Sequence, residues 1–166
     1  MYLECFDKVQ EWGTLPSELQ GLVDKCRQLW EEAAALGHAD AQFGLGVMHH
    51  QGQGVQQDYD KARYYLECAA LQDFAPAQCT LGFMEEFGEG MEPDFSKAEY
   101  WYEQAADQGY MDAQFNLAIL YIKGQAVTND PLKVQELLES AAQQGLSEAR
   151  EMLVRVSAAA MCRCPC

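Results

Sequence analysis

Basic residues are scarce in this sequence. The chain of 166 residues carries 11 lysines and arginines against 26 aspartates and glutamates, which gives a formal net charge of −15. This balance argues against a broad surface for nucleic acid or anionic membranes, because both are themselves negatively charged. The acidic surface either serves solubility alone or favours basic partners, which it would capture in a salt-sensitive way.

Long apolar runs are absent as well. No stretch approaches the roughly 20 apolar residues that a transmembrane helix needs. The first residues, MYLECFDKVQEW, lack the basic start and the apolar stretch of a secretory signal, so we expect a cytoplasmic protein. Hydrophobic residues make up 49% of the chain and charged residues 22%, which is typical of a folded domain and not of a disordered one.

The cysteines follow no spacing that would give each segment of the chain its own pair. This absence argues against a disulfide-stapled extracellular protein and favours reduced thiols. Four of them fall at helical, mostly core-like positions, where cysteine acts as a small hydrophobe. These are Cys5, Cys26, Cys68 and Cys79, and the other three are Cys162, Cys164 and Cys166.

Motifs of catalysis and of metal binding are missing. There is no G-x-S-x-G, no phosphate-binding glycine loop and no H-E-x-x-H. Glu85, Glu86 and Glu89 lack a partnering histidine for acid–base work. His49 and His50 are adjacent, and adjacent helical side chains point about 100° apart, which disfavours a shared metal ion. We therefore expect no enzyme activity and no catalytic, cofactor-binding or metal site.

A fixed step of 36 residues dominates the sequence. An Ala-Ala pair recurs at this step, and leucines, glycines, aspartates and lysines around it keep the same spacing. The pairs are Ala33-Ala34, Ala69-Ala70, Ala105-Ala106 and Ala141-Ala142. A constant period in this range indicates a repeat array, in which each unit buries its apolar face only by stacking on its neighbours.

Each repeat reads as two helices joined by a glycine-containing loop. In residues 39–70, Ala41, Leu45 and Met48 share one face of the first helix, and glycines at positions 52 and 54 end it. Asp58 is suited to accept backbone N–H bonds at the start of the second helix. Extended along the chain, this pattern predicts about nine helices in antiparallel pairs, beginning with a degenerate helix at residues 2–12.

The repeats predict one domain over residues 1–161, followed by a cysteine-rich tail over 162–166. A degenerate N-terminal cap repeat at 1–36 is followed by full repeats at 37–72, 73–108 and 109–144, and by a capping helix at 145–161. The alternating tail thiols at 162, 164 and 166 suit lipid attachment, cross-linking or a soft metal, or they belong to a frayed terminus. A lipid-anchored or metal-binding protein that acts through this tail is thus an alternative.

The repeated positions together resemble the SEL-1-like repeat, a relative of the tetratricopeptide repeat. In the first full unit they are Ala41, Leu45, Gly46, Gly52, Gly54, Val55, Asp58, Lys61, Ala62, Ala69 and Ala70. The resemblance implies an all-α, right-handed α-solenoid that acts as an adaptor or scaffold for proteins or peptides, without reaction chemistry or cofactors. One departure is that His49 and Glu85 stand where the family often has tyrosine, which only Tyr121 keeps.

In such a solenoid the first helix of each pair lines the concave side. These helices carry a second apolar stripe, and an apolar groove rimmed by Glu85, Glu86 and Glu89 would suit a basic protein or peptide with apolar anchors. The stripe instead packs on itself, or under the terminal helix, if the curvature is tight. The expected binding residues are Phe43, Val47, His50, Phe83, Glu85, Glu86, Phe87, Glu89, Phe115, Ile119 and Ile122.

Two roles are compatible with such a groove. An adaptor would bind a partner protein reversibly, with an affinity that is usually micromolar. An immunity or inhibitor protein would instead neutralise a basic toxin, such as a nuclease, by covering its active site, and would bind at nanomolar concentrations or tighter.

Overall fold

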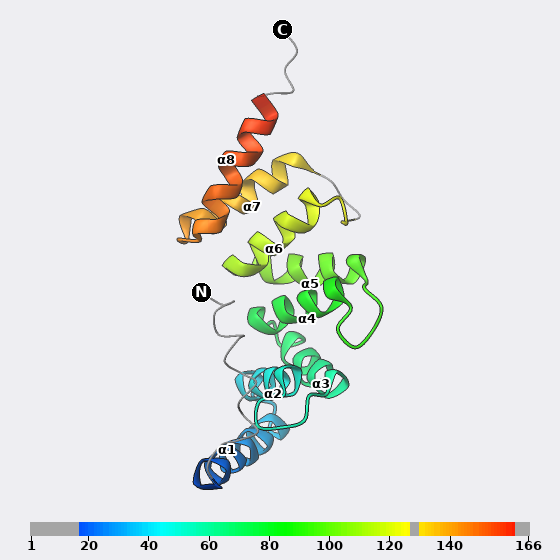
Figure 1. The fold of residues 1–166 in the computed structure, drawn as a ribbon, viewed down its shortest axis with the longest axis vertical. Coiled ribbons are helices and arrows are strands. Elements are labelled where there is room, and N and C mark those ends of the chain that lie inside the picture. The colour runs from blue at the N-terminus through cyan, green and yellow to red at the C-terminus, as the bar shows by residue number, and fades with distance from the viewer. Residues whose placement is uncertain (1–16, 127–129, 162–166) are drawn as a thin grey trace. The chain divides into compact units, whose positions relative to one another are not determined.

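The protein is entirely helical in the residues that the structure describes. A computed structural model describes residues 17–126 and 130–161, and Figure 1 shows their eight helices. These are α1 (Ser17–Ala35), α2 (Ala39–Gln51), α3 (Tyr59–Ala70), α4 (Ala75–Phe87), α5 (Phe95–Asp107), α6 (Met111–Ile122), α7 (Pro131–Gln143) and α8 (Ser147–Met161). The helix predicted at residues 2–12 lies outside the described residues.

The 36-residue period of the sequence is also the period of the helices. The helices α2, α4, α6 and α8 begin at residues 39, 75, 111 and 147, and α3, α5 and α7 begin at residues 59, 95 and 131. Both series therefore advance by 36 residues. The all-α fold class and the repeat of helix pairs are confirmed.

Two compact units make up the chain, residues 1–77 and 78–166. In the first unit, α2 packs against both α1 and α3. In the second unit, α6 packs against α5 and α7, and α7 packs against α8. Each of these helices thus finds its main partners next to it in the sequence, as expected when every repeat buries its apolar face on its neighbours.

Aspartate caps start the second helix of each pair. The side chains of Asp58, Asp94 and Asp130 accept backbone N–H bonds of 2.9–3.1 Å in the first turns of α3, α5 and α7. The bond from the Lys61 backbone is the main reason why the pKa of Asp58 is lowered. At the end of α2, Gly52 adopts a left-handed backbone conformation with φ of 69°. The predicted roles of Asp58 and Gly52 are confirmed.

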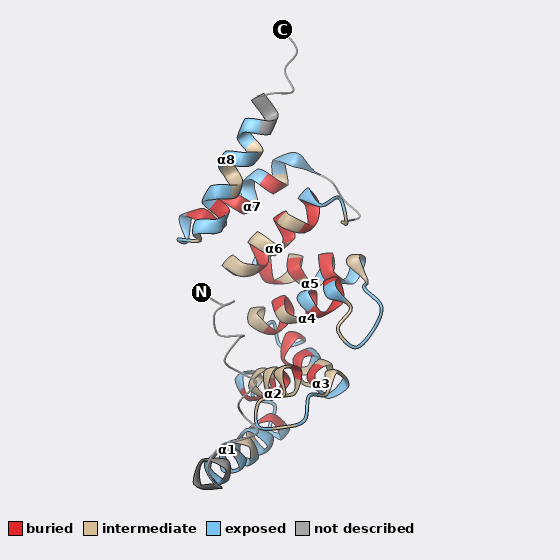
Figure 2. Ribbon diagram, viewed as in Figure 1, coloured by how far each residue is buried: buried red, intermediate tan, exposed pale blue. Residues whose placement is uncertain are grey.

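Small residues form most of the core where helices meet. Figure 2 shows the buried residues concentrated on the helix sides that face neighbouring helices. In the first unit, Ala34, Ala41 and Leu45 form a buried cluster that Met48 and Tyr65 cover. Buried alanines let helix axes approach closely, so the few large buried side chains have little room to move. In the second unit those large side chains include Tyr102, Tyr121 and Leu117.

Each full repeat contains a pair of hydrogen-bonded glutamines, which sequence reasoning missed. The Nε2 of one glutamine donates to the Oε1 of another 30 residues earlier, at 2.7, 2.7 and 3.0 Å. The pairs are Gln72–Gln42, Gln108–Gln78 and Gln144–Gln114. Because both glutamines recur at the 36-residue step, the sequence contained the signal. Its meaning was hidden because glutamine is usually an exposed residue.

Substitution of Gln114 by leucine is expected to lower the free energy of unfolding by about 1–2 kcal/mol. Gln114 is buried, donates to the Ala106 carbonyl at 3.4 Å and accepts from Gln144 at 3.0 Å, and leucine can do neither. Urea denaturation measures the change. Gln143→Leu on the exposed side of α7 is the control, and it should stay within about 0.5 kcal/mol of the wild type. Equal stability of the two variants would show that the glutamine pairs contribute nothing.

Candidate functional site

The helices α4 and α6 lie side by side in the second unit. The Asn116 amide donates to the Cys79 thiol at 3.8 Å, and the Lys123 ammonium reaches Glu86 at 2.8 Å. These contacts bring together residues 37 apart, from the first helices of consecutive repeats and the residue that follows α6. We call the apolar stripe of these two neighbouring helices the α4–α6 face and define it by Phe83, Phe87, Phe115, Ile119 and Ile122.

Aromatic side chains are exposed on this face. The rings of Phe83 and Phe87 stand one helical turn apart on α4, with centroids 4.5 Å apart. Their exposed fractions are 36% and 54%, and that of Ile122 is 44%. Exposed apolar side chains that gather in this way are unusual unless they serve binding.

The other residues of the face are only partly covered. Phe115 and Ile119 on α6 are half-buried. Lys123 extends over the Phe87 ring, with its ammonium 5.6 Å from the ring centroid. The stripe in the second unit thus has an accessible apolar surface with a cation at one end.

In the first unit, the predicted binding residues are less accessible. Phe43 and Val47 are half-buried, and the Phe43 ring packs against Phe74 with centroids 5.4 Å apart. His50 is buried and meets the edge of the Tyr59 ring. The expectation that His50 contributes to an open groove differs from the structure, because its buried ring packs against Tyr59 at the start of α3.

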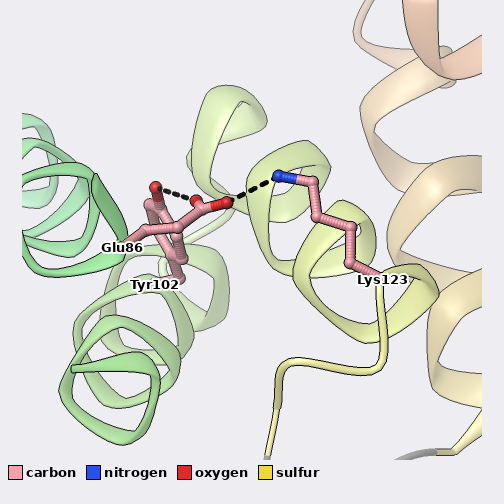
Figure 3. Close-up of polar contacts among 3 residues, drawn as sticks. All are labelled: Glu86, Tyr102 and Lys123. Carbon is pink, nitrogen blue, oxygen red and sulfur yellow. Dashed lines mark hydrogen bonds and ion pairs between the residues drawn. The ribbon is translucent and has the colours of Figure 1, made fainter. Parts of the chain in front are cut away.

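The expectation of a solvated acidic rim is wrong for two of its three members. Glu85 and Glu86 are buried, and only Glu89, in the turn after α4, is half-buried. Figure 3 shows the Glu86 carboxylate between the Tyr102 hydroxyl, which donates to Oε2 at 3.0 Å, and the Lys123 ammonium, which donates to Oε1 at 2.8 Å. The negative charge of Glu86 is therefore neutralised by contacts within the protein.

Burial is the physical reason for this arrangement. A buried carboxylate is stable only when hydrogen bonds and an opposite charge compensate its lost hydration. The pKa of Tyr102 is raised, first by burial of its ring and then by the adjacent Glu86. Tyr102 therefore stays protonated and remains a hydrogen-bond donor to Glu86.

A second group of the same composition lies further along the chain. Both the Tyr121 hydroxyl, at 3.0 Å, and the Lys133 ammonium donate to Oε1 of Glu103. The hydrogen bond to Glu103 is the main cause of the raised pKa of Lys133. Sequence reasoning missed both groups, because the members of one group do not lie 36 residues from the corresponding members of the other.

The histidines of α2 take no part in a shared site. The His49 ring stacks on Tyr65 while His50 faces Tyr59, so the two imidazoles point to different neighbours. Over residues 17–126 and 130–161, no cluster of three histidine, cysteine or acidic side chains is placed to hold a metal ion.

The cysteines of the described residues are free thiols with different surroundings. Cys79 is buried, and burial raises its thiol pKa to about 12, so it is inert. Cys68 is half-buried, whereas Cys26 is exposed, in contrast to the core-like position expected for it. Cys5 and the tail at 162–166 lie outside the described residues. None of the described helices has the length and apolar character needed to span a membrane.

A comparison with protein families shows which family this chain belongs to. The profile of the Sel1 repeat matches residues 23–38, 39–74, 75–110 and 112–146, which is well over half of the chain. The chain belongs to the Sel1 repeat family. Each of the last three matched segments holds one first helix and one second helix, so the Sel1 repeats coincide with the helix pairs described above. A search of curated proteins gave no match.

Solved structures carry the same Sel1 fold. A Sel1 repeat protein from Oxalobacter formigenes is 34% identical over 77% of this chain and 96% of its own, with a TM-score of 0.71. A protective antigen of uropathogenic Escherichia coli strains, which displays an SLR fold, is 32% identical over 76% of this chain, with a TM-score of 0.71. The match spans only 27% of that antigen's length.

A more distant structure shows the likeness in fold alone. The cysteine rich protein B of Helicobacter pylori is 22% identical over 81% of this chain and 96% of its own, with a TM-score of 0.63.

Proposed function

We propose that this Sel1-repeat protein is a non-enzymatic scaffold that binds a protein or peptide partner through the α4–α6 face. The observation that carries the proposal is the exposed Phe83–Phe87 pair, whose ring centroids lie 4.5 Å apart, with Lys123 after α6 over the Phe87 ring. Aromatic residues at the centre of an interface supply a large part of its binding energy. Sel1-repeat solenoids typically serve as interaction scaffolds, which supports the same reading.

Charge directs the choice of partner at long range. The net charge of −15 attracts basic proteins, whereas Glu85 and Glu86 are buried and contribute little directly. The proposed partner is therefore basic as a whole and contacts the face through apolar anchors. The free thiols of Cys26, Cys68 and Cys79 suit a reducing compartment, so a cytoplasmic location is part of the proposal.

A double variant tests this function. Replacing Phe83 and Phe87 by serine is expected to weaken partner binding by about 2 kcal/mol or more, which is about 30-fold in Kd. The partner is first captured from a lysate of the source organism at low and moderate salt and identified by mass spectrometry. The purified partner is then titrated calorimetrically into wild type and variant.

The matched control removes two apolar side chains that are on average more exposed than Phe83 and Phe87, from other helices of the same unit. These are Tyr100 on α5 and Leu132 on α7, which are 53% and 72% exposed. Serine at both positions should leave the affinity unchanged. If the control weakens binding as much as the test variant does, the partner binds elsewhere. A micromolar Kd would indicate an adaptor, and a nanomolar Kd would indicate an inhibitor.

A further inference from the structure

A polar pocket of about 320 Å³ lies in the first unit, within residues 27–61, and shares no residue with the α4–α6 face. Arg27 of α1, His49 of α2 and Lys61 of α3 line it, together with residues 55–58 of the loop between α2 and α3. Three helices and one loop thus converge on it. Its volume is at the lower end of the range of small-molecule sites.

The repeats themselves indicate why a pocket exists at this place. His49 occupies the repeat position that Tyr121 occupies two 36-residue steps later, and Lys61 is likewise the equivalent of Lys133. Tyr121 is fully buried, and the Lys133 ammonium covers its ring at 5.6 Å from the centroid. The imidazole of His49 is shorter than the phenol of Tyr121, and it lines the pocket. Lys61 approaches Asp58 at 3.4 Å instead of covering a ring.

The residues that line the pocket are unusually basic for this protein. They include two cations, Arg27 and Lys61, and one carboxylate, Asp58. The whole chain, by contrast, has more than twice as many acidic as basic residues. Asp58 already accepts the Lys61 backbone N–H at 3.0 Å as the cap of α3. One terminal nitrogen of Arg27 is held by Asp24 at 3.0 Å.

Two buried nitrogens of the lining residues have unused hydrogen-bonding capacity. Within the described part of the chain, no protein atom hydrogen-bonds to Arg27 Nε or to His49 Nδ1. Buried polar atoms of this kind are rare in folded proteins and often belong to a site that takes up a water or an ion. An anion in the pocket would accept hydrogen bonds from both nitrogens, since arginine and protonated histidine donate strong hydrogen bonds to charged oxygens.

We infer that this pocket binds a small oxyanion, a carboxylate or a phosphate-like group, through Arg27 and Lys61 with His49 as a protonation-linked third donor. The groups that face His49 are Lys61, Asp58 and Glu31, besides Arg27 across the pocket. Burial, followed by Lys61, lowers the pKa of His49, so its ring is neutral at pH 7.5. A bound anion favours the protonated ring, and binding therefore strengthens as the pH falls from 7.5 towards 5.5.

Nuclear magnetic resonance titration of the full chain tests this inference. Sulfate serves as a tetrahedral probe whose charge is constant over this pH range, and succinate serves as a carboxylate probe. Sodium chloride at equal ionic strength is the reference. Saturable shifts of the signals of Arg27, His49 and Lys61 are expected, with tighter sulfate binding at pH 5.5 than at pH 7.5. Saturation by sulfate alone supports a phosphate-like ligand, and saturation by succinate alone supports a carboxylate.

Variants separate the pocket from general charge effects. Arg27→Gln and Lys61→Gln should each weaken binding about tenfold, the loss expected for one charge-assisted hydrogen bond. His49→Tyr copies Tyr121, fills the space and should abolish binding in a folded protein, with folding checked by circular dichroism. Lys97→Gln is the matched control, because Lys97 pairs with Asp94 at 3.5 Å as Lys61 pairs with Asp58. Shifts no larger than those with chloride, or an equal loss in Lys97→Gln, would overturn the inference.

Discussion

Replacing Lys123 by methionine is expected to lower the free energy of unfolding by about 2 kcal/mol. The substitution keeps an apolar chain against Phe87 but removes the ammonium that lies 2.8 Å from Glu86. The Glu86 side chain is only 7% exposed, so its charge would stay buried with the Tyr102 hydroxyl as its remaining partner in this group. The loss stays below that of a fully buried pair because the Lys123 side chain is 43% exposed and water reaches it.

Chemical denaturation compares this variant with a matched ion pair. Lys97 lies 3.5 Å from Asp94, and both side chains are more than a third exposed. Lys97→Met should therefore change the stability by no more than about 0.5 kcal/mol. Adding Glu86→Gln to Lys123→Met should recover part of the loss, because a neutral amide still accepts from Tyr102. If Lys123→Met and Lys97→Met are equally stable, the burial of Glu86 does not create the cost described here.

Alanine at Gly82 is expected to destabilise the protein by about 1–3 kcal/mol, as overpacking of a tight core does. A Cβ atom there would stand 2.6 Å from Cδ1 and 2.7 Å from Cε1 of the Tyr102 ring. The ring is fully buried and its hydroxyl is bonded to Glu86, so it cannot turn aside without losing that bond. The equivalent positions one repeat later are Ala118 and Leu138, both fully buried, so the repeat that has alanine has leucine in place of the tyrosine.

Thermal and urea unfolding measure this effect against a second glycine. Gly21 lies within α1, and a Cβ atom added to it would meet no atom within 4 Å, so Gly21→Ala should stabilise the protein by about 0.5–1 kcal/mol. The double variant Gly82→Ala, Tyr102→Leu imitates the Ala118–Leu138 pair. It should lose less stability than the two single variants together, because the tyrosine ring that meets the added Cβ atom is replaced by a smaller side chain. A Gly82→Ala protein as stable as wild type would show that the ring moves freely.

The positions that repeat in the sequence were those whose structure could be predicted. The caps Asp58 and Gly52, and the buried face of Ala41 and Leu45, follow from interactions within one helix pair. Such local interactions recur in each unit, so the sequence shows the same residue several times at the same step. That recurrence distinguishes a structural position from a chance residue.

The candidate site was predicted only in part, and the reason is again physical. Phe83, Phe87 and Ile122 are apolar and exposed, but whether they bind a partner stays a prediction. Glu86 was expected at a solvated rim because charged residues are usually exposed. Its burial depends on Tyr102 and Lys123, which lie 16 and 37 residues further along the chain and do not repeat with it.

The spacing of residue types along the chain was enough to predict the helices, their order, the 36-residue step and the resemblance to the Sel1 repeat family. These features rest on backbone caps, on helical periodicity and on contacts between neighbouring repeats, all of which are written in the spacing of residue types. Which polar side chains are buried and paired, and that Arg27, His49 and Lys61 line one pocket, became visible in the three-dimensional packing. The burial and pairing of a side chain depend on the size and charge of the side chains that a neighbouring helix places against it. The position of a residue within the repeat does not reveal those neighbours.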